Sequence, residues 1–147
     1  MRIVRKKSER GNAMLEFAIG FAVLWFLFTG VYQFGYAFYM YNVLQTATAN
    51  AAELGSKMSY DTGDPSGYQT ALQNMVVYGD ETTGTSPLVP GLTTANVTVT
   101  ANPVDYPTSI TVTVTSFTID AFFKKFVFSG KPRATVQFYG QVQCASC

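Results

Sequence analysis

The stretch Gly11-Asn12-Ala13-Met14-Leu15-Glu16-Phe17 decides the fold, because it opens a long apolar segment with one carboxylate near its start. From Phe17 to Ala52 the sequence contains no charged residue. A carboxylate in a membrane-length apolar helix costs a few kcal/mol unless a cation pairs with it, so Glu16 is a candidate functional residue. If the chain were cut after Gly11, the new α-amino group of Asn12 would be a cation that can neutralise Glu16 of a neighbouring copy.

This arrangement resembles the prepilins of tight-adherence, type IV-class pili, and most closely the TadE-like pilins or pseudopilins. In that family a short basic leader ends in glycine, a prepilin peptidase cleaves after it, and Glu-Phe or Glu-Tyr follows at the fifth and sixth mature positions. Arg10-Gly11 and Glu16-Phe17 fill those positions here. The resemblance continues through the segments Tyr32-Gln33-Phe34-Gly35, Asn42 to Ser56 and Val76-Val77-Tyr78-Gly79-Asp80.

The resemblance implies a role for each of these residues. Gly11 and Asn12 would be the processing site, and Glu16 and Phe17 would act in assembly. The implied partners are other copies of the chain in a helical polymer, the prepilin peptidase, the pilus assembly machinery of the inner membrane and, before assembly, the lipid bilayer. The implied location is the inner membrane at first and the extracellular pilus afterwards.

Basic residues are concentrated in the N-terminal segment. Met1 to Gly11 carries five basic residues and one acidic residue, whereas the rest of the chain carries five basic and eight acidic residues. Lys and Arg beside a first apolar segment stay in the cytoplasm, so this leader predicts that the C-terminal part is exported. With a net charge near −3, the exported part is not expected to bind nucleic acid.

The apolar run from Ala13 to Tyr41 is too long for an ordinary secretory signal, whose apolar region has about 7–15 residues. A plain, uncleaved membrane anchor is the competing interpretation, and the spacing of Gly11 and Glu16 argues against it. We therefore expect a basic leader at residues 1–11, a transmembrane or filament-core helix at 12–39 and an extracytoplasmic domain at 40–147.

One helix is predicted from about Asn12 to Gly55, where a Gly-Ser pair is a suitable stop. Such a helix is about 65 Å long, roughly twice the hydrocarbon thickness, so its second half must leave the bilayer. The pattern turns amphipathic after Met40, and the apolar stripe can pack on a globular domain. The stripe comprises Val43, Leu44, Ala47, Ala51 and Leu54, and the polar side comprises Asn42, Gln45, Thr46, Asn50 and Glu53.

A dense group of aromatic residues lies near the middle of this helix. Its members are Tyr32, Phe34, Tyr36, Phe38, Tyr39 and Tyr41. Amphipathic aromatic rings are enriched at membrane–water interfaces, and the group begins about twenty residues after Ala13, so it is interpreted as an interfacial belt.

The rest of the chain indicates one short helix followed by strands. Asp64-Pro65 reads as an N-cap with proline in the first turn, an apolar face follows at Tyr68, Leu72, Met75 and Val76, and Gly79 ends the pattern. A loop is expected from Asp80 to Thr94. Strands are predicted at Val97–Ala101, Ile110–Thr115 and Arg133–Gln143, while Ala121–Phe128 is open between a strand extension, a hairpin arm and an exposed loop.

These elements predict an α+β fold. The long N-terminal helix, transmembrane in one half and amphipathic in the other, would pack on a small antiparallel sheet of three or four strands with one short extra helix, as in type IV pilins. The apolar face of the sheet should cover the helix and the threonines should face solvent or a neighbouring subunit.

The chain ends in Cys144-Ala145-Ser146-Cys147. A zinc site needs two further ligands, and the sequence has no histidine and no other cysteine. In an exported protein the first expectation is a disulfide between Cys144 and Cys147, and bridges to another subunit are the alternative. Type IV pilins often have a C-terminal disulfide, but with a wider spacing than this pair has.

No catalytic constellation is present in the sequence. It has no histidine, no phosphate-binding loop and no nucleophile motif, and the carboxylates beyond Glu53 fall mostly in turns. We therefore expect neither an enzyme nor a cofactor. Three interpretations remain: a pilin or minor pseudopilin, a membrane-anchored factor that primes or caps a pilus, and an anchored surface domain unrelated to pili.

Overall fold

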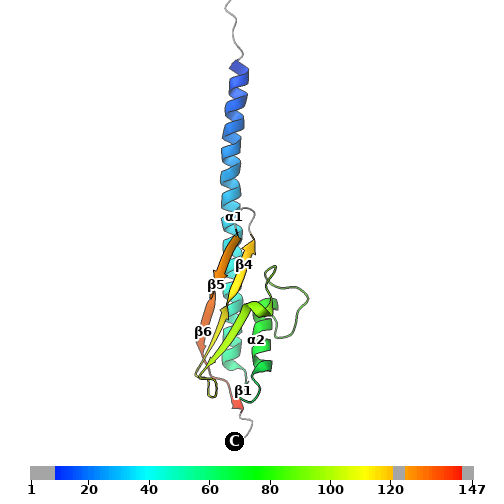
Figure 1. The fold of residues 1–147 in the computed structure, drawn as a ribbon, viewed down its shortest axis with the longest axis vertical. Coiled ribbons are helices and arrows are strands. Elements are labelled where there is room, and N and C mark those ends of the chain that lie inside the picture. The colour runs from blue at the N-terminus through cyan, green and yellow to red at the C-terminus, as the bar shows by residue number, and fades with distance from the viewer. Residues whose placement is uncertain (1–8, 121–124, 144–147) are drawn as a thin grey trace, which may run out of the picture. The chain divides into compact units, whose positions relative to one another are not determined.

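The computed structural model describes residues 9–120 and 125–143. In this part of the chain lie helices α1 (Glu9–Lys57) and α2 (Ser66–Tyr78) and the 3₁₀ helix η1 (Thr94–Asn96). The strands are β1 (Tyr60–Asp61), β2 (Val97–Asn102), β3 (Ser109–Val114), β4 (Ser116–Asp120), β5 (Lys125–Ser129), β6 (Arg133–Gln137) and β7 (Val142–Gln143). The predicted α+β class is confirmed: a long N-terminal helix packs on small, mainly antiparallel sheets accompanied by a short helix (Figure 1).

The chain divides into two compact units, Met1–Tyr36 and Ala37–Cys147, and helix α1 contributes to both. In the first unit every side chain from Gly11 to Phe28 is exposed. The second unit contains the rest of α1 together with α2 and all the strands. We call this second unit the head domain.

In the head domain, α1 buries three members of the predicted apolar stripe, and the other two, Val43 and Leu54, are half-buried. Leu44, Ala47 and Ala51 are buried, as are Thr48 and Ala52 one position further around the helix. The Thr48 hydroxyl donates to the Leu44 carbonyl at 2.7 Å, so this buried polar group is satisfied inside the helix. The five predicted polar residues, Asn42, Gln45, Thr46, Asn50 and Glu53, are all exposed.

The predicted end of α1 at Gly55 is wrong by two residues, because the helix continues to Lys57. Gly55 serves as a packing position. A Cβ built on it would lie 2.7 Å from Cδ1 of Leu72 and from the Tyr68 hydroxyl, and that hydroxyl donates to the Gly55 carbonyl at 2.7 Å. Glycine is therefore required for α2 to approach α1 this closely.

Helix α2 begins one residue later than the sequence suggests. Pro65, with helical φ and ψ of −75° and −1°, occupies the cap position, and the Asp64 carboxylate accepts the backbone N–H of Ser66 at 3.1 Å. The predicted end is confirmed, since Gly79 adopts a left-handed conformation with φ of 77° and donates to the Met75 carbonyl at 3.1 Å.

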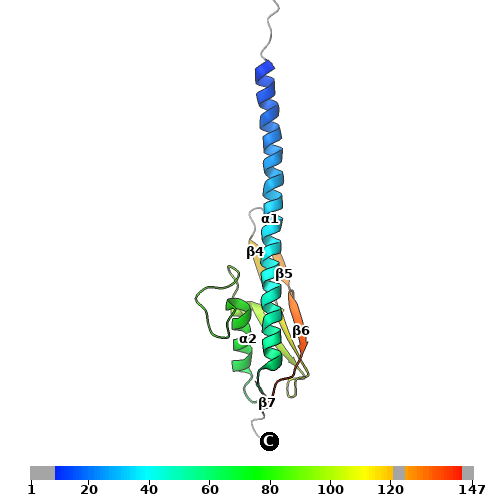
Figure 2. The ribbon, with the colours of Figure 1, turned by 180° about the vertical axis from the view of Figure 1, so that it is seen from behind.

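Strands β2, β3 and β6 form an antiparallel sheet in the order β2-β3-β6. The alternating pattern is confirmed in β2 and β3. Val97, Val99, Ile110, Val112 and Val114 are buried, while Thr98 and Thr100 are exposed. This sheet lies beside the head-domain part of α1 in both views (Figure 2).

The single last strand predicted for Arg133–Gln143 is wrong. Strand β6 ends at Gln137, and the separate β7 pairs in parallel with β1, so that Tyr60 lies opposite Val142. Between them the chain passes the end of α1, where the Tyr139 N–H donates to the Ser56 carbonyl at 2.8 Å. This bond satisfies one of the terminal carbonyls that a helix leaves unpaired. Gly140 permits the passage, because a Cβ there would lie 2.1 Å from the Met58 carbonyl oxygen.

Strands β4 and β5 form an antiparallel hairpin that the sequence indicates only in part. Strand β4 was not predicted, and of the three interpretations for Ala121–Phe128 the hairpin arm is the one that β5 fits. The connecting residues 121–124 lie outside the described residues. The hairpin packs against α1 through the rings of Phe128 and Tyr41, whose centroids are 5.4 Å apart.

Candidate functional site

The four residues predicted for processing and assembly lie close together at the start of α1. Gly11, Asn12, Glu16 and Phe17 are all helical and exposed. Because α1 begins at Glu9, the predicted cleavage point between Gly11 and Asn12 lies within the first turns of the helix in the uncut chain.

Glu16 lies on an exposed face of α1 that also includes Asn12 and Gly20. Asn12 and Gly20 lie one turn before and one turn after it, since residues four apart share a helix face. Gly20 has no side chain, and a Cβ built on it would meet nothing within 4 Å. Among the side chains described for residues 11–120 and 125–143, the ion pairs are Lys57–Glu53 and Lys125–Asp120, and neither involves Glu16. The Glu16 side chain is exposed.

A row of stacked aromatic rings runs along α1 next to Glu16. The ring centroids of Phe17 and Phe21 are 6.2 Å apart, and those of Phe21 and Trp25 are also 6.2 Å apart. All three side chains are more than half exposed. Sequence analysis missed this row, although the regular spacing of four residues is a readable signal for it. Large apolar surfaces of this kind are buried by lipid or by a partner.

Helix α1 is long and apolar enough to span a membrane, and its most apolar window is not buried within the chain. The aromatic group predicted as an interfacial belt lies on the same helix. Tyr32, Phe34, Phe38 and Tyr39 are exposed, whereas Tyr36 and Tyr41 are half-buried. Tyr41 contributes to the head domain by packing on Phe128, so the group has at least two environments. The interfacial belt stays a prediction for the exposed rings.

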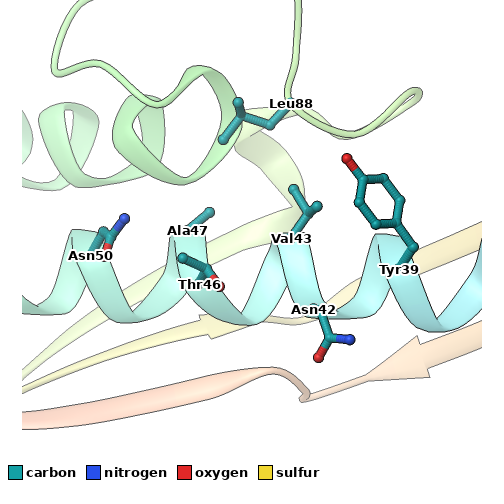
Figure 3. Close-up of a pocket in the computed structure, with 7 residues that line it drawn as sticks. All are labelled: Tyr39, Asn42, Val43, Thr46, Ala47, Asn50 and Leu88. Carbon is teal, nitrogen blue, oxygen red and sulfur yellow. The ribbon is translucent and has the colours of Figure 1, made fainter.

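Two shallow hollows lie on the head domain. The first, of about 320 Å³, lies between the exposed side of α1 and the loop after α2 (Figure 3). It is lined by Tyr39, Asn42, Val43, Thr46, Ala47, Asn50 and Leu88. The second, of about 390 Å³, lies on the outward face of the three-stranded sheet. It is lined by Thr100, Asn102, Ser109, Thr111, Thr113, Arg133 and Thr135.

The outward face of the three-stranded sheet is polar because of its register. Thr100, Thr111 and Thr135 lie opposite one another across the strands, and the hydroxyls of Thr111 and Thr135 are hydrogen-bonded at 2.9 Å. The next row consists of Thr98, Thr113 and Arg133. Sequence patterning predicts this face for solvent or a neighbouring subunit, and its exposure fits either use.

The ionisable groups of the head domain are held by local contacts. Lys57 donates to the Glu53 carboxylate at 2.8 Å and lowers the pKa of Glu53, and the hydrogen bonds from Ser66 lower the pKa of Asp64. Burial raises the pKa of the Tyr68 hydroxyl, which donates to a backbone carbonyl. Within the described residues no group of three or more metal-ligating side chains is present.

Cys144 and Cys147 lie outside the described residues, directly after β7. We expect them to be joined to each other in exported protein, because that compartment favours disulfides. Mass spectrometry of the intact, non-reduced chain should then show the loss of two hydrogens per monomer. The variant Cys144→Ser should carry one free thiol. Two free thiols in the wild type, or a covalent dimer that separates on reduction, would contradict the intrachain bond.

Comparison with known proteins gives one match. The family model described as TadE-like protein matches residues 11–53, which begin at the predicted processing site and cover most of α1. The chain matches no curated protein and no solved structure. The matched segment includes Gly11, Asn12, Glu16 and Phe17, and the head domain beyond residue 53 lies outside it. The predicted resemblance is thus confirmed over residues 11–53, which match the TadE-like family model.

Proposed function

We propose that the chain is a structural subunit, a pilin or minor pseudopilin, of a tight-adherence pilus. In this proposal a prepilin peptidase cuts after Gly11 and the mature chain polymerises through α1. The observation that carries the proposal is the exposed Glu16, five residues after Gly11 on an apolar helix, within the segment that matches the TadE-like family. The role is structural, with no catalysis and no cofactor.

The arrangement of α1 supports two successive environments for the same surface. Before assembly, lipid covers the exposed side chains from Gly11 to Phe28. In the filament, neighbouring helices cover them, and the apolar rows of Phe17, Phe21 and Trp25 pack against other copies. The basic leader keeps the N-terminus in the cytoplasm until it is removed, so the head domain is exported from the inner membrane.

Two other functions use the same sequence features. A membrane-anchored factor that primes or caps the pilus would also be cleaved, but it would be scarce in purified filaments. An anchored surface domain unrelated to pili would keep its leader. The amount of the chain in sheared, purified filaments distinguishes a priming or capping factor from the proposed subunit. The state of the N-terminus, cut or uncut, distinguishes an anchored surface domain from both.

Cleavage between Gly11 and Asn12 is the direct test. We expect the cell-surface protein to begin at Asn12, and Gly11→Val to accumulate the uncut precursor, because the bulky side chain replaces the hydrogen beside the scissile bond. Gly20→Val is the matched control. It adds the same side chain to the same helix at a position with open space around it, and it should be cut normally.

N-terminal sequencing and peptide mapping provide the readout. An intact Arg10-Gly11-Asn12 junction in wild-type surface protein would contradict the proposed cleavage. The chain would then be an anchored surface domain.

A further inference from the structure

We propose that the polar hollow on the outward face of the three-stranded sheet binds a second copy of this chain, through the loop that follows α2 in that copy. In this contact Arg133 of one copy pairs with Glu81 of the next. The inference rests on the proposed function, since it names the head-domain surfaces by which filament subunits meet. It uses only residues of the unit Ala37–Cys147.

The hollow, of about 390 Å³, is suited to a negatively charged group. Arg133 is the cation in its lining, and the other described residues that line it carry hydroxyl or amide groups and no carboxylate. The hydroxyls of Thr111 and Thr135 share one hydrogen bond of 2.9 Å, which leaves the hydrogen of one of them available to an outside acceptor. A guanidinium group beside hydroxyl donors is a favourable setting for a carboxylate.

The cations at this face have no carboxylate partner in the described part of their own chain. Lys131 and Arg133 are both exposed and lie two positions apart at the start of β6. The ion pairs among the described side chains are Lys57–Glu53 and Lys125–Asp120, and neither involves them. Positive charge at this face is therefore available to a partner.

Complementary charge lies on the loop that follows α2. Asp80 and Glu81 are adjacent and exposed, and neither belongs to an ion pair among the described side chains. The N–H and the hydroxyl of Thr82 donate to the Asp80 carboxylate at 2.9 and 2.8 Å, and these bonds lower the pKa of Asp80. The carboxylate of Asp80 is therefore ionised at neutral pH.

Contacts with α2 hold this loop in position. Asn74 is buried, and its amide donates to the Glu81 carbonyl at 3.1 Å. The Leu88 N–H donates to the Val77 carbonyl at 2.7 Å. A loop that is already ordered loses little conformational entropy when it binds, so the carboxylates are presented at low cost.

The arrangement of the two surfaces identifies a second copy as the partner. The loop after α2 and strand β6 lie on opposite sides of the head-domain part of α1 in both views (Figures 1 and 2). A contact between two different surfaces leaves a free hollow on one copy and a free loop on the other, so it continues from copy to copy. A pair of identical sheet faces would instead bring Arg133 against Arg133.

Cross-linking of the full chain tests the contact. Cys144→Ser and Cys147→Ser remove the two natural cysteines, and Thr83→Cys and Thr135→Cys then mark the loop and the sheet face. Both marked threonines are exposed. Membranes and sheared filaments are treated with a short bis-maleimide. The doubly marked chain should give a ladder of dimers, trimers and larger products, whereas each singly marked chain should stay monomeric.

Charge reversal in the doubly marked chain tests the pairing. Arg133→Glu and Glu81→Arg should each lower the ladder yield about tenfold, because like charges then face each other, and the two changes together should restore it. Lys125→Glu is the matched control. It makes the same change of charge on β5, where Lys125 is 3.2 Å from Asp120 in its own chain, and it should leave the yield unchanged.

The outcomes distinguish this contact from the proposed function. If the chain is present in filaments but the doubly marked chain gives no ladder, the filament role stands and the contact is wrong. If Thr135→Cys alone gives dimers, the sheet face meets itself and the contact is wrong. If the combined reversal is as weak as the single ones, Arg133 and Glu81 do not pair. A ladder in membranes from a chain that is absent from filaments would support the contact and overturn the filament role.

Discussion

Glu16→Ala is expected to abolish or strongly reduce incorporation of the chain into filaments while leaving its insertion into the membrane intact. The charge opposes burial in lipid, so removing it can only ease insertion. In the filament, the amine of Asn12 in one subunit and the carboxylate of Glu16 in another would attract by up to about 4 kcal/mol at 4 Å and an effective dielectric of 20, before desolvation is subtracted. Repeated at every subunit, a fraction of this energy sets the axial register.

The matched control for this variant is Glu53→Ala. Glu53 is an exposed carboxylate on the same helix, but it is paired with Lys57 in the chain itself. Its loss should leave incorporation unchanged. Among replacements at position 16, aspartate should keep some function and glutamine less, because only aspartate keeps the charge. The readout is the amount of each variant in sheared filaments relative to the amount in membranes. Wild-type incorporation of Glu16→Ala would rule out the paired-charge mechanism, and the pilin assignment would then rest on cleavage alone.

Leu72→Ala is expected to cost about 2–5 kcal/mol in the free energy of unfolding of the head domain, as large-to-small changes at buried leucines do. Leu72 is fully buried and fills the space above Gly55, so its loss leaves a cavity between α2 and α1. Domains of this size have only about 5–15 kcal/mol of stability, so the variant loses a large part of it. We expect a clear shift of the urea midpoint for the full chain in detergent micelles, followed by near-ultraviolet circular dichroism.

Leu88→Ala is the matched control for the buried site. It removes the same atoms from a leucine that is 44% exposed, and its midpoint should move little. Equal midpoints for the two variants would show that the contact between α2 and α1 does not support the head domain. In cells, the destabilised Leu72→Ala chain should also accumulate to a lower level, because unfolded protein is degraded.

Sequence patterns predicted the elements that depend on local periodicity. Helix α1 follows from the uncharged run between Glu16 and Glu53, and β2 and β3 follow from strict alternation of apolar residues with threonine. The pairing of β1 with β7 was not predictable, because each strand has two residues and the register joins Tyr60 to Val142 across most of the head domain. The local signal for the break between β6 and β7 is Gly140. A glycine within a strand pattern can mark either a bulge or a break, and the pattern alone does not say which.

The same distinction between local and long-range features applies to the candidate site. The spacing from Gly11 to Glu16 is a local feature, and residues 11–53 of the sequence carry it without help from the fold. The packing of Phe128 on Tyr41 is a ring contact between distant segments, so no sequence pattern shows it. The terminal cysteines lie outside the described residues, and their pairing stays a prediction.

The attachment of the head domain to α1 has a mechanical consequence for the proposed filament subunit when it is under tension. Contacts reach α1 from three separate parts of the chain: Tyr68 bonds to Gly55, Phe128 packs on Tyr41, and Tyr139 bonds to Ser56. A pull on the helix therefore loads these attachments side by side, so they share the force. If one of these three contacts breaks, the other two still hold the rest of the head domain on α1. Detachment of the domain from the helix therefore requires all three contacts to break.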